Sequence, residues 1–390
     1  TRRSSDLLFI TVDDPTDSDC SAAVLNNDLS AIQNWANQWL VTFNSTKTKT
    51  MLVSRKRIPS YSPVHFQGNT LENVTQQKYL GLVISSDSSW SSHINYIASK
   101  AKRLIGVMKM LQYKLSRRSL EIVYFMYIRP ILEYGDVVWG GCTESDAELL
   151  ESIQLAAARA VTGATRCTSH SKIYSETGWE TLSKRREKHR LKLFYKMIHG
   201  QAPSYLNNLI PANVSSRNQY NVRSKNNLTE PKCRLNLFKN SFIPSTIRQW
   251  NMLPRAVRNS EDVELFQRKL DSDIQKTNEL FYIGNRRLNI LHARIRMGCS
   301  QLNHDMHKIG LTSSSACTCG APSETSFHFF FECPNNIVHR NSLQSVVIPL
   351  APFTLNTLLY GSKNCSKANN KIIFESVQNF ILLSGRFKPP

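Results

Sequence analysis

Three segments decide the fold of the first part of this chain: LNNDLSAIQNWANQWL (25–40), VTFNSTKTKTMLVS (41–54) and KYLGLVI (78–84). The first places apolar residues at spacings of three and four, which predicts an amphipathic helix over about residues 21–40. The second and third hold short apolar runs bounded by polar and turn-forming residues, which predicts strands. The stretch therefore predicts a helix followed by strands, the order expected of an α+β domain.

The strands expected in this part of the chain lie at residues 7–12, 51–53 and 79–84. Gln67-Gly68-Asn69 stands between two short apolar segments and predicts a hairpin turn. Asp13-Asp14-Pro15 ends the first strand, and we interpret it as a solvated acidic turn.

From His93 onward the pattern becomes helical. Ser116 is placed to cap a helix that Pro130 should kink or end. Ser145-Asp146-Ala147-Glu148 has the form of a capping box, and Gly163 stands where that next helix should stop. Four further helices are expected, at residues 181–199, 261–270, 286–302 and 371–383, with an apolar docking segment at 242–254 and a polar linker near 211–236.

The chain of 390 residues is strongly basic, with 49 Lys and Arg against 29 Asp and Glu and a net charge of +20. Such a surplus indicates a polyanionic partner, of which nucleic acid is the commonest. The alternative is a basic protein without such a partner. We find no signal peptide and no run long enough to span a membrane. Nine scattered cysteines argue for a reducing compartment, so an intracellular location, in the nucleus or the cytoplasm, is expected.

The three quoted segments resemble the end of the palm domain of reverse transcriptases from non-LTR retrotransposons of the jockey or LINE type. The resemblance continues at RPILEYG (129–135), at Trp139 and at AARAVTG (157–163), and it covers residues 7–165 best. It implies an α+β fold: a partial palm sheet, a mainly helical thumb, a basic helical region and a small zinc-knuckle-like tail. The expected boundaries are 1–97, 98–165, 166–300 and 301–390. The missing initiator methionine suggests a fragment of a longer protein.

In this family the catalytic carboxylates lie on an aromatic-Ala-Asp-Asp turn before a strand like the one at 7–12, where they hold Mg²⁺. Here that place holds Thr1-Arg2-Arg3-Ser4-Ser5-Asp6, and guanidinium groups cannot ligate Mg²⁺. The resemblance therefore predicts no complete catalytic site, and Mg²⁺ belongs only to the intact parent enzyme. We do not take Asp13-Asp14 as a substitute, because it follows the strand.

The resemblance carries two further palm elements onto this sequence. Lys47 matches a lysine placed near the triphosphate, where it would act as a proton donor; the alternative is a surface lysine on a turn. Tyr79, Leu80 and Gly81 match the strand that grips the primer, and the alternative is an ordinary core strand.

Beyond the palm, a run of nineteen residues contains seven basic residues and no acidic one. The resemblance places them where the thumb follows the template–primer duplex, so we expect them to contact RNA and DNA phosphates. The alternative is a solvated charged face. The seven residues are Lys100, Lys102, Arg103, Lys109, Lys114, Arg117 and Arg118.

Near the end of the chain Cys317, Cys319, His328 and Cys333 have the spacing C-x-C-x8-H-x4-C. Three thiolates and one imidazole form a sufficient tetrahedral set for structural Zn²⁺, although the C-x-C half is tighter than usual. The alternative is a set of core thiols and a core histidine without metal. His304, His307 and His339 are expected to be exposed. No small-molecule cofactor is apparent.

These patterns lead to one interpretation and one alternative. The chain is interpreted as a fragment of an RNA-directed DNA polymerase that binds nucleic acid and does not polymerise alone. The alternative is a repurposed or decayed nucleic-acid-binding protein with no polymerase role.

Overall fold

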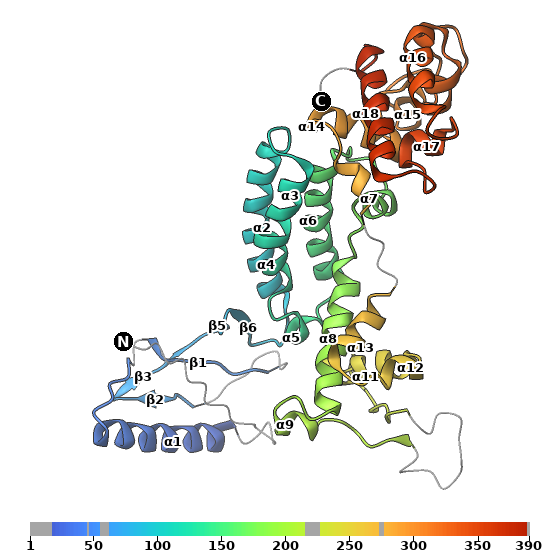
Figure 1. Ribbon diagram of the computed structural model, residues 1–390. Coiled ribbons are helices and arrows are strands. Elements are labelled where there is room, and N and C mark those ends of the chain that lie inside the picture. Colours follow the sequence, from blue (N-terminus) through green and yellow to red (C-terminus); the bar gives the residue numbers. More distant parts are fainter. Residues whose placement is uncertain (1–17, 45–46, 55–61, 215–226, 273–276, 388–390) are drawn as a thin grey trace. The chain divides into compact units, whose positions relative to one another are not determined.

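The computed structural model describes residues 18–44, 47–54, 62–214, 227–272 and 277–387. The chain divides into two compact units, residues 1–97 with 142–146 and residues 98–141 with 147–390. The fold is mostly helical, with a few small sheets (Figure 1). The strand expected at 7–12 and the acidic turn after it lie outside the described residues. No helix in the described ranges combines the length and the apolarity that a membrane crossing requires.

The first unit is built on helix α1, Ser18–Gln38, which confirms the predicted amphipathic helix. Leu25 and Leu29 pack against a small core of Val64, Phe66 and Leu71. The apolar residues at the C-terminal end of this helix do not join the core, because Trp35 and Trp39 are exposed.

Strands in the described part of the first unit form three two-stranded sheets, and the palm sheet is not confirmed. Strand β1 (Lys49–Thr50) pairs in parallel with β4 (Glu72–Asn73). Strand β2 (His65–Phe66) pairs antiparallel with β3 (Asn69–Thr70), which confirms the predicted hairpin. Its turn residues Gln67 and Gly68 both have positive φ, as a tight two-residue turn requires. The strand expected at 51–53 is wrong, because β1 ends at Thr50.

The single strand expected at 79–84 is also wrong. The structure has a second hairpin, β5 (Gln76–Tyr79) and β6 (Leu82–Ser85). Leu80 and Gly81 are its turn, with φ of 46° and 87°. A glycine adopts this backbone readily and a leucine rarely does, so the apolar sequence conceals the turn.

Helix α2 (Ser91–Leu111) begins in the first unit and continues into the second. Ser116 caps the next helix as predicted, because its side chain accepts a hydrogen bond from the backbone N–H of Ser119. The helix that Ser116 caps continues past Pro130 to Glu133. It is irregular before the proline, where a π-helical turn separates α3 from α4. The elements in order are α3 (Arg117–Val123), the π-helix η2 (Tyr124–Ile128), α4 (Arg129–Glu133) and α5 (Asp136–Trp139).

Helix α6 (Glu144–Thr162) begins earlier than the predicted capping box. Thr143, not Ser145, caps it, because the Thr143 hydroxyl accepts from the backbone N–H of Asp146 at 3.2 Å. Gly163 ends the helix with a φ of 75°, as predicted.

The middle of the second unit packs around Phe194, Tyr195, Trp250 and Phe266. The docking segment at 242–254 is helical over Phe242–Met252. At the described ends of the predicted linker, Asn213 and Leu228 form an isolated antiparallel bridge, and helix α10 begins at the last linker residue, Asn236. Leu228 at one of those ends is buried and exchanges two hydrogen bonds with Asn251. The elements are α7 (His170–Thr177), α8 (Leu182–Ile198), α9 (Ser204–Asn207), α10 (Asn236–Asn240), α11 (Phe242–Met252), α12 (Arg255–Arg258) and α13 (Val263–Leu270).

The last part of the second unit has its own core, in which helix α18 packs against α14, α16 and α17 (Figure 1). Phe329, Phe330 and Phe380 meet at its centre. The elements are η4 (Glu279–Tyr282), α14 (Arg286–Met297), α15 (Asn303–Lys308), η5 (His328–Glu332), η6 (Pro334–Asn336), α16 (Ile337–Val347), α17 (Leu355–Tyr360) and α18 (Lys367–Leu383).

Candidate metal centre and basic surface

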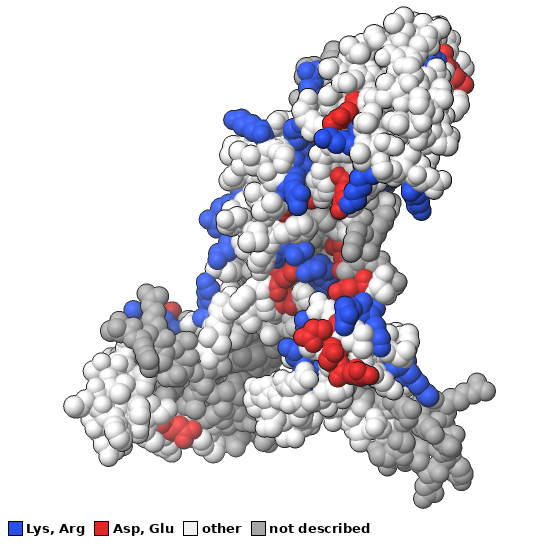
Figure 2. Space-filling view, viewed as in Figure 1, with Lys and Arg blue, Asp and Glu red and all other residues white. Residues whose placement is uncertain are grey.

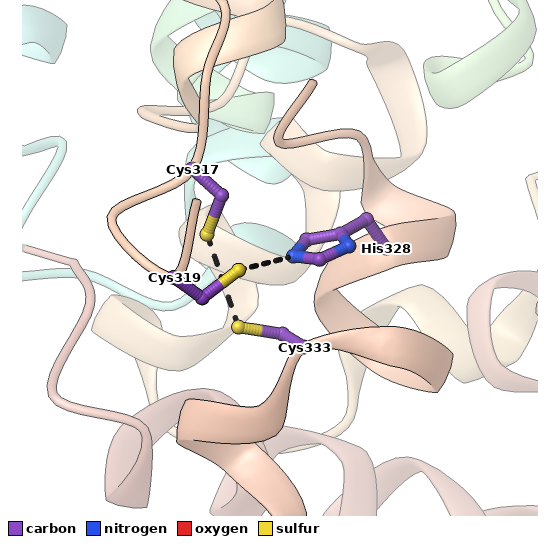
Figure 3. Close-up of side chains that lie close together, drawn as sticks. All are labelled: Cys317, Cys319, His328 and Cys333. Carbon is purple, nitrogen blue, oxygen red and sulfur yellow. Dashed lines mark hydrogen bonds between the residues drawn. The ribbon is translucent and has the colours of Figure 1, made fainter. Parts of the chain in front are cut away.

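The structure brings together the four residues of the predicted Cys/His site. Cys317 and Cys319 lie on the loop before η5, His328 begins that turn, and Cys333 follows it (Figure 3). Their candidate ligand atoms all lie within 4.8 Å of one another. The sequence spacing therefore produces one cluster in space.

The separations within the cluster fit a tetrahedral metal. The sulfurs of Cys317 and Cys333 are 3.8 Å apart, and the sulfur of Cys319 is 3.3 Å from Nε2 of His328. Two thiolates about 2.3 Å from one zinc ion lie about 3.8 Å apart in tetrahedral geometry. The donor set and its spacing thus suit Zn²⁺, which remains a candidate ligand.

A π-helical turn places His328 and Cys333 on the same side. In an α-helix two residues five positions apart point about 140° away from each other. Here the backbone N–H of Cys333 donates to the carbonyl of His328 at 2.8 Å, the five-residue step of a π-helix. The wider turn directs the side chains of His328 and Cys333 toward the same place. Two residues separated by four others can therefore both belong to the cluster.

The thiols of the cluster differ in acidity. Burial raises the pKa of the Cys333 thiol to about 11. The backbone N–H of Ala321 lowers the pKa of the Cys319 thiol to about 7. A metal binds thiolates, so binding at Cys333 must displace a proton.

Three histidines near the cluster lie outside it. His304 and His307 are exposed as expected, and His339 is half-buried. In the described ranges they do not join the four-residue group.

Six of the seven predicted phosphate contacts are exposed on α2, on the turn after it and at the start of α3: Lys100, Lys102, Arg103, Lys109, Lys114 and Arg118. We call these six the basic face. Arg117 is not part of it, because its side chain is buried and donates to Glu176 at 2.7 Å. In Figure 2 the Lys and Arg side chains follow α2, whereas the helices at the C-terminal end show few.

Other basic residues of the second unit are engaged within the fold. Arg286 donates to the carbonyls of Gln112, Ala160 and Val161 at 2.6 Å each. Arg294 donates to the carbonyl of Gly163 at 2.7 Å. Arg286 and Arg294 of the basic stretch at 286–302 therefore close the ends of neighbouring helices, and they are not free to contact a partner in the way the exposed residues of the basic face are.

Helix α8 shows the same internal use of charge. Lys188 contacts Glu180 at 2.6 Å and Asp271 at 2.7 Å. Arg185 pairs with Glu133, and this carboxylate raises the pKa of the Arg185 guanidinium. A run of basic residues in the sequence is thus partly neutralised by acids that are distant in the chain.

The predicted palm residues lie in the first unit. Lys47 is exposed on a turn, where its backbone N–H donates to the side chain of Asn44 at 3.2 Å. Leu80 is 66% exposed at the tip of the β5–β6 hairpin. The basic face belongs to the second unit.

Glu332 and Arg340, which the sequence patterns do not single out, also contact the Cys/His cluster or its backbone. A carboxylate of Glu332 lies 3.3 Å from Nδ1 of His328. Buried Arg340 donates to the carbonyls of Phe331 and Cys333. The signal available in the sequence was the acid four residues after the candidate ligand His328.

Comparison with known proteins finds homologues among the polymerases of transposable elements. The chain is 24% identical over 197 residues to the probable RNA-directed DNA polymerase from transposon X-element of Drosophila melanogaster, covering 47% of this chain and 22% of that protein. It is 27% identical over 143 residues to the RNA-directed DNA polymerase from mobile element jockey of the same species, covering 36% and 16%.

A longer match is to the retrovirus-related Pol polyprotein from type-1 retrotransposable element R1 of Bradysia coprophila. It has 22% identity over 330 residues and covers 78% of this chain and 29% of that protein. The chain thus spans less than a third of each of these relatives. No family model and no solved structure matches.

The class defined by these comparisons is that of polymerases from transposable elements. More particularly, the homologues are reverse transcriptases of non-LTR retrotransposons, matched at low identity over part of the chain. The resemblance identified from the sequence is thereby confirmed.

Proposed function

We propose that this chain is the part of an RNA-directed DNA polymerase that follows the catalytic carboxylates. It binds RNA and DNA through the basic face on α2 and α3. The observation that carries the proposal is that six basic residues are exposed there while many others are engaged within the fold. Contacts of this kind bind phosphates without reading sequence.

Under this proposal the chain has four regions, with the boundaries expected from the sequence. They are the end of the palm at 1–97, the thumb at 98–165, a basic helical region at 166–300 and a Cys/His region at 301–390. The Cys/His cluster holds structural Zn²⁺ in this scheme. Four protein ligands close the coordination sphere, so the metal supplies folding stability and no open position for substrate.

The proposal predicts a weaker and less salt-dependent interaction with nucleic acid when the basic face is neutralised. Replacing Lys100, Lys102 and Arg103 by alanine should lower the affinity for an RNA·DNA duplex at least tenfold. The slope of log K against log salt concentration should become less steep by about 2 to 3, because three phosphate contacts release fewer counterions. Fluorescence anisotropy across a salt series measures both quantities.

The matched control removes the same charge elsewhere. Lys308, Lys363 and Lys371 are exposed in the C-terminal region, and their replacement by alanine should leave the slope close to that of the wild type. Equal losses in the two triple variants would show that net charge alone drives binding and would remove the basic face as a site.

A second prediction concerns catalysis. The 390 residues contain no aromatic-Ala-Asp-Asp sequence, so the chain should yield no product in primer extension with Mg²⁺ and a template–primer. A full-length reverse transcriptase in the same mixture serves as the positive control. Product that disappears on Asp13→Asn/Asp14→Asn substitution would overturn this part of the proposal.

The alternative is a nucleic-acid-binding module with no polymerase role. The lack of an aromatic-Ala-Asp-Asp sequence in these 390 residues is compatible with both hypotheses. The two differ in substrate preference. A polymerase part should bind a recessed template–primer junction more tightly than a blunt duplex of the same length, whereas a general binding module should not distinguish them.

A further inference from the structure

The ring of His328 is held at both nitrogens. Nε2 faces the sulfur of Cys319 at 3.3 Å, and Nδ1 lies 3.3 Å from a carboxylate oxygen of Glu332 (Figure 3 shows the ring beside the three sulfurs, with one nitrogen toward Cys319). The ring is buried, while the Glu332 side chain is 58% exposed. A solvent-facing acid thus reaches inward to a buried imidazole.

This contact determines which nitrogen of His328 carries the proton. A carboxylate accepts hydrogen bonds and does not donate them, so Nδ1 must be the protonated nitrogen. In the neutral ring, the form that ligates a metal, Nε2 then keeps its lone pair, which is directed at the three sulfurs. Only this tautomer can donate an electron pair to a metal placed among them.

We propose that Glu332 is a positioning residue of the Cys/His metal centre, which fixes the tautomer and the orientation of His328. The inference rests on the proposed function in one respect, namely that the cluster binds a metal. It assigns to Glu332 a role that differs from ligation, since its carboxylate contacts the ring edge opposite the sulfurs.

The backbone around Glu332 is held by contacts that do not involve its side chain. The π-turn is closed by the hydrogen bond from Cys333 to His328, and the guanidinium of Arg340 donates to the carbonyls of Phe331 and Cys333. Phe329 and Phe330 anchor the same turn in the core. Removing the Glu332 carboxylate should therefore leave the fold intact and change only the imidazole.

Another carboxylate near the cluster cannot replace Glu332. Glu324 is buried, and both of its oxygens are bound by Arg386 at 2.6 Å. Glu324 approaches the sulfur of Cys317 at 4.0 Å, on a different ligand of the cluster. The two acids therefore have separate roles.

The experiment measures Co²⁺ binding to the full chain and its variants by the visible absorption of the tetrahedral complex. Glu332→Ala should lower the affinity by about 10- to 100-fold, the usual cost of removing such a partner. Glu332→Gln keeps an acceptor for Nδ1 and should fall between Glu332→Ala and the wild type. All three should show the same absorption envelope at saturation, because the four ligands are unchanged.

The matched control is Glu375→Ala. Glu375 is also half-exposed and faces a residue four positions earlier, Lys371 at 3.9 Å, and it should bind Co²⁺ like the wild type. A second readout is the ¹⁵N spectrum of His328 in the metal-free chain. The wild type should show Nδ1 protonated, and Glu332→Ala a mixture of both tautomers.

Two failures are distinguishable. Wild-type protein that binds Co²⁺ with the same affinity as Glu332→Ala overturns the role of Glu332 and leaves the metal centre standing. Wild-type protein that takes up no Co²⁺ while correctly folded overturns the metal centre and with it this inference.

Discussion

Replacement of Cys319 by serine is expected to abolish the stabilisation that the proposed zinc site gives to the C-terminal region. A ligand present at a thousand times its dissociation constant stabilises the folded state by about 4 kcal/mol. A serine hydroxyl at this position is a poor zinc ligand, so the variant should lose most of this effect. Thermal unfolding with and without added Zn²⁺ measures it: the wild type should shift upward with metal, and Cys319→Ser should not.

Cys299→Ser provides the control for this experiment. Cys299 is half-buried in the same region and lies outside the cluster, so its variant should retain about the wild-type zinc response. Zinc analysis of dialysed protein adds a direct count, with one ion per chain expected for the wild type. If Cys319→Ser keeps both its zinc and its thermal shift, the four residues are not the metal site.

Much of the local structure was predictable because its signals are contained in a few adjacent residues. Ser116 caps a helix by accepting a hydrogen bond from the backbone N–H of Ser119, three residues later. Gly163 ends another helix by adopting a positive φ. The turn at Gln67-Gly68 and the Cys/His spacing belong to the same kind of signal. In each case the chemistry of the residue itself provides the hydrogen bond, the positive φ or the donor atom that the local structure needs.

Two kinds of error show where such reasoning stops. The sequence predicts one strand where the structure has the hairpin turn at Leu80-Gly81, because a leucine with positive φ cannot be recognised within an apolar run. The sequence places Arg117 among the phosphate contacts, whereas the fold buries it between Glu121, four positions away, and Glu176, 59 positions away. A run of basic residues shows only that the segment is basic. Whether each side chain is free or paired with an acid depends on which helices the fold brings together.

The largest single effect on stability is expected at Glu176. Its carboxylate accepts from Arg117 at 2.7 Å and from Arg296 at 2.8 Å, and all three side chains are buried. Glu176→Ala leaves two buried guanidinium groups without this partner, and breaking such a pair costs about 3–5 kcal/mol. Urea denaturation should show the loss as a lower midpoint, whereas Glu375→Ala, at an exposed pair, should stay within about 0.5 kcal/mol of the wild type.

The pH dependence of the same network gives an independent test. Burial acts to raise the pKa of Glu176, but the guanidinium groups of Arg296 and Arg117 outweigh it, so the pKa of the folded state lies below the ordinary value. A depressed pKa contributes stability that is complete above the unfolded value, about pH 4.3, and is lost as the pH falls through the folded value. The stability difference between the wild type and Glu176→Gln should therefore be constant near neutral pH and shrink in acid. A difference that stays constant down to pH values at which the wild type unfolds would mean that the Glu176 charge does not stabilise the fold, and that its burial is a matter of packing alone.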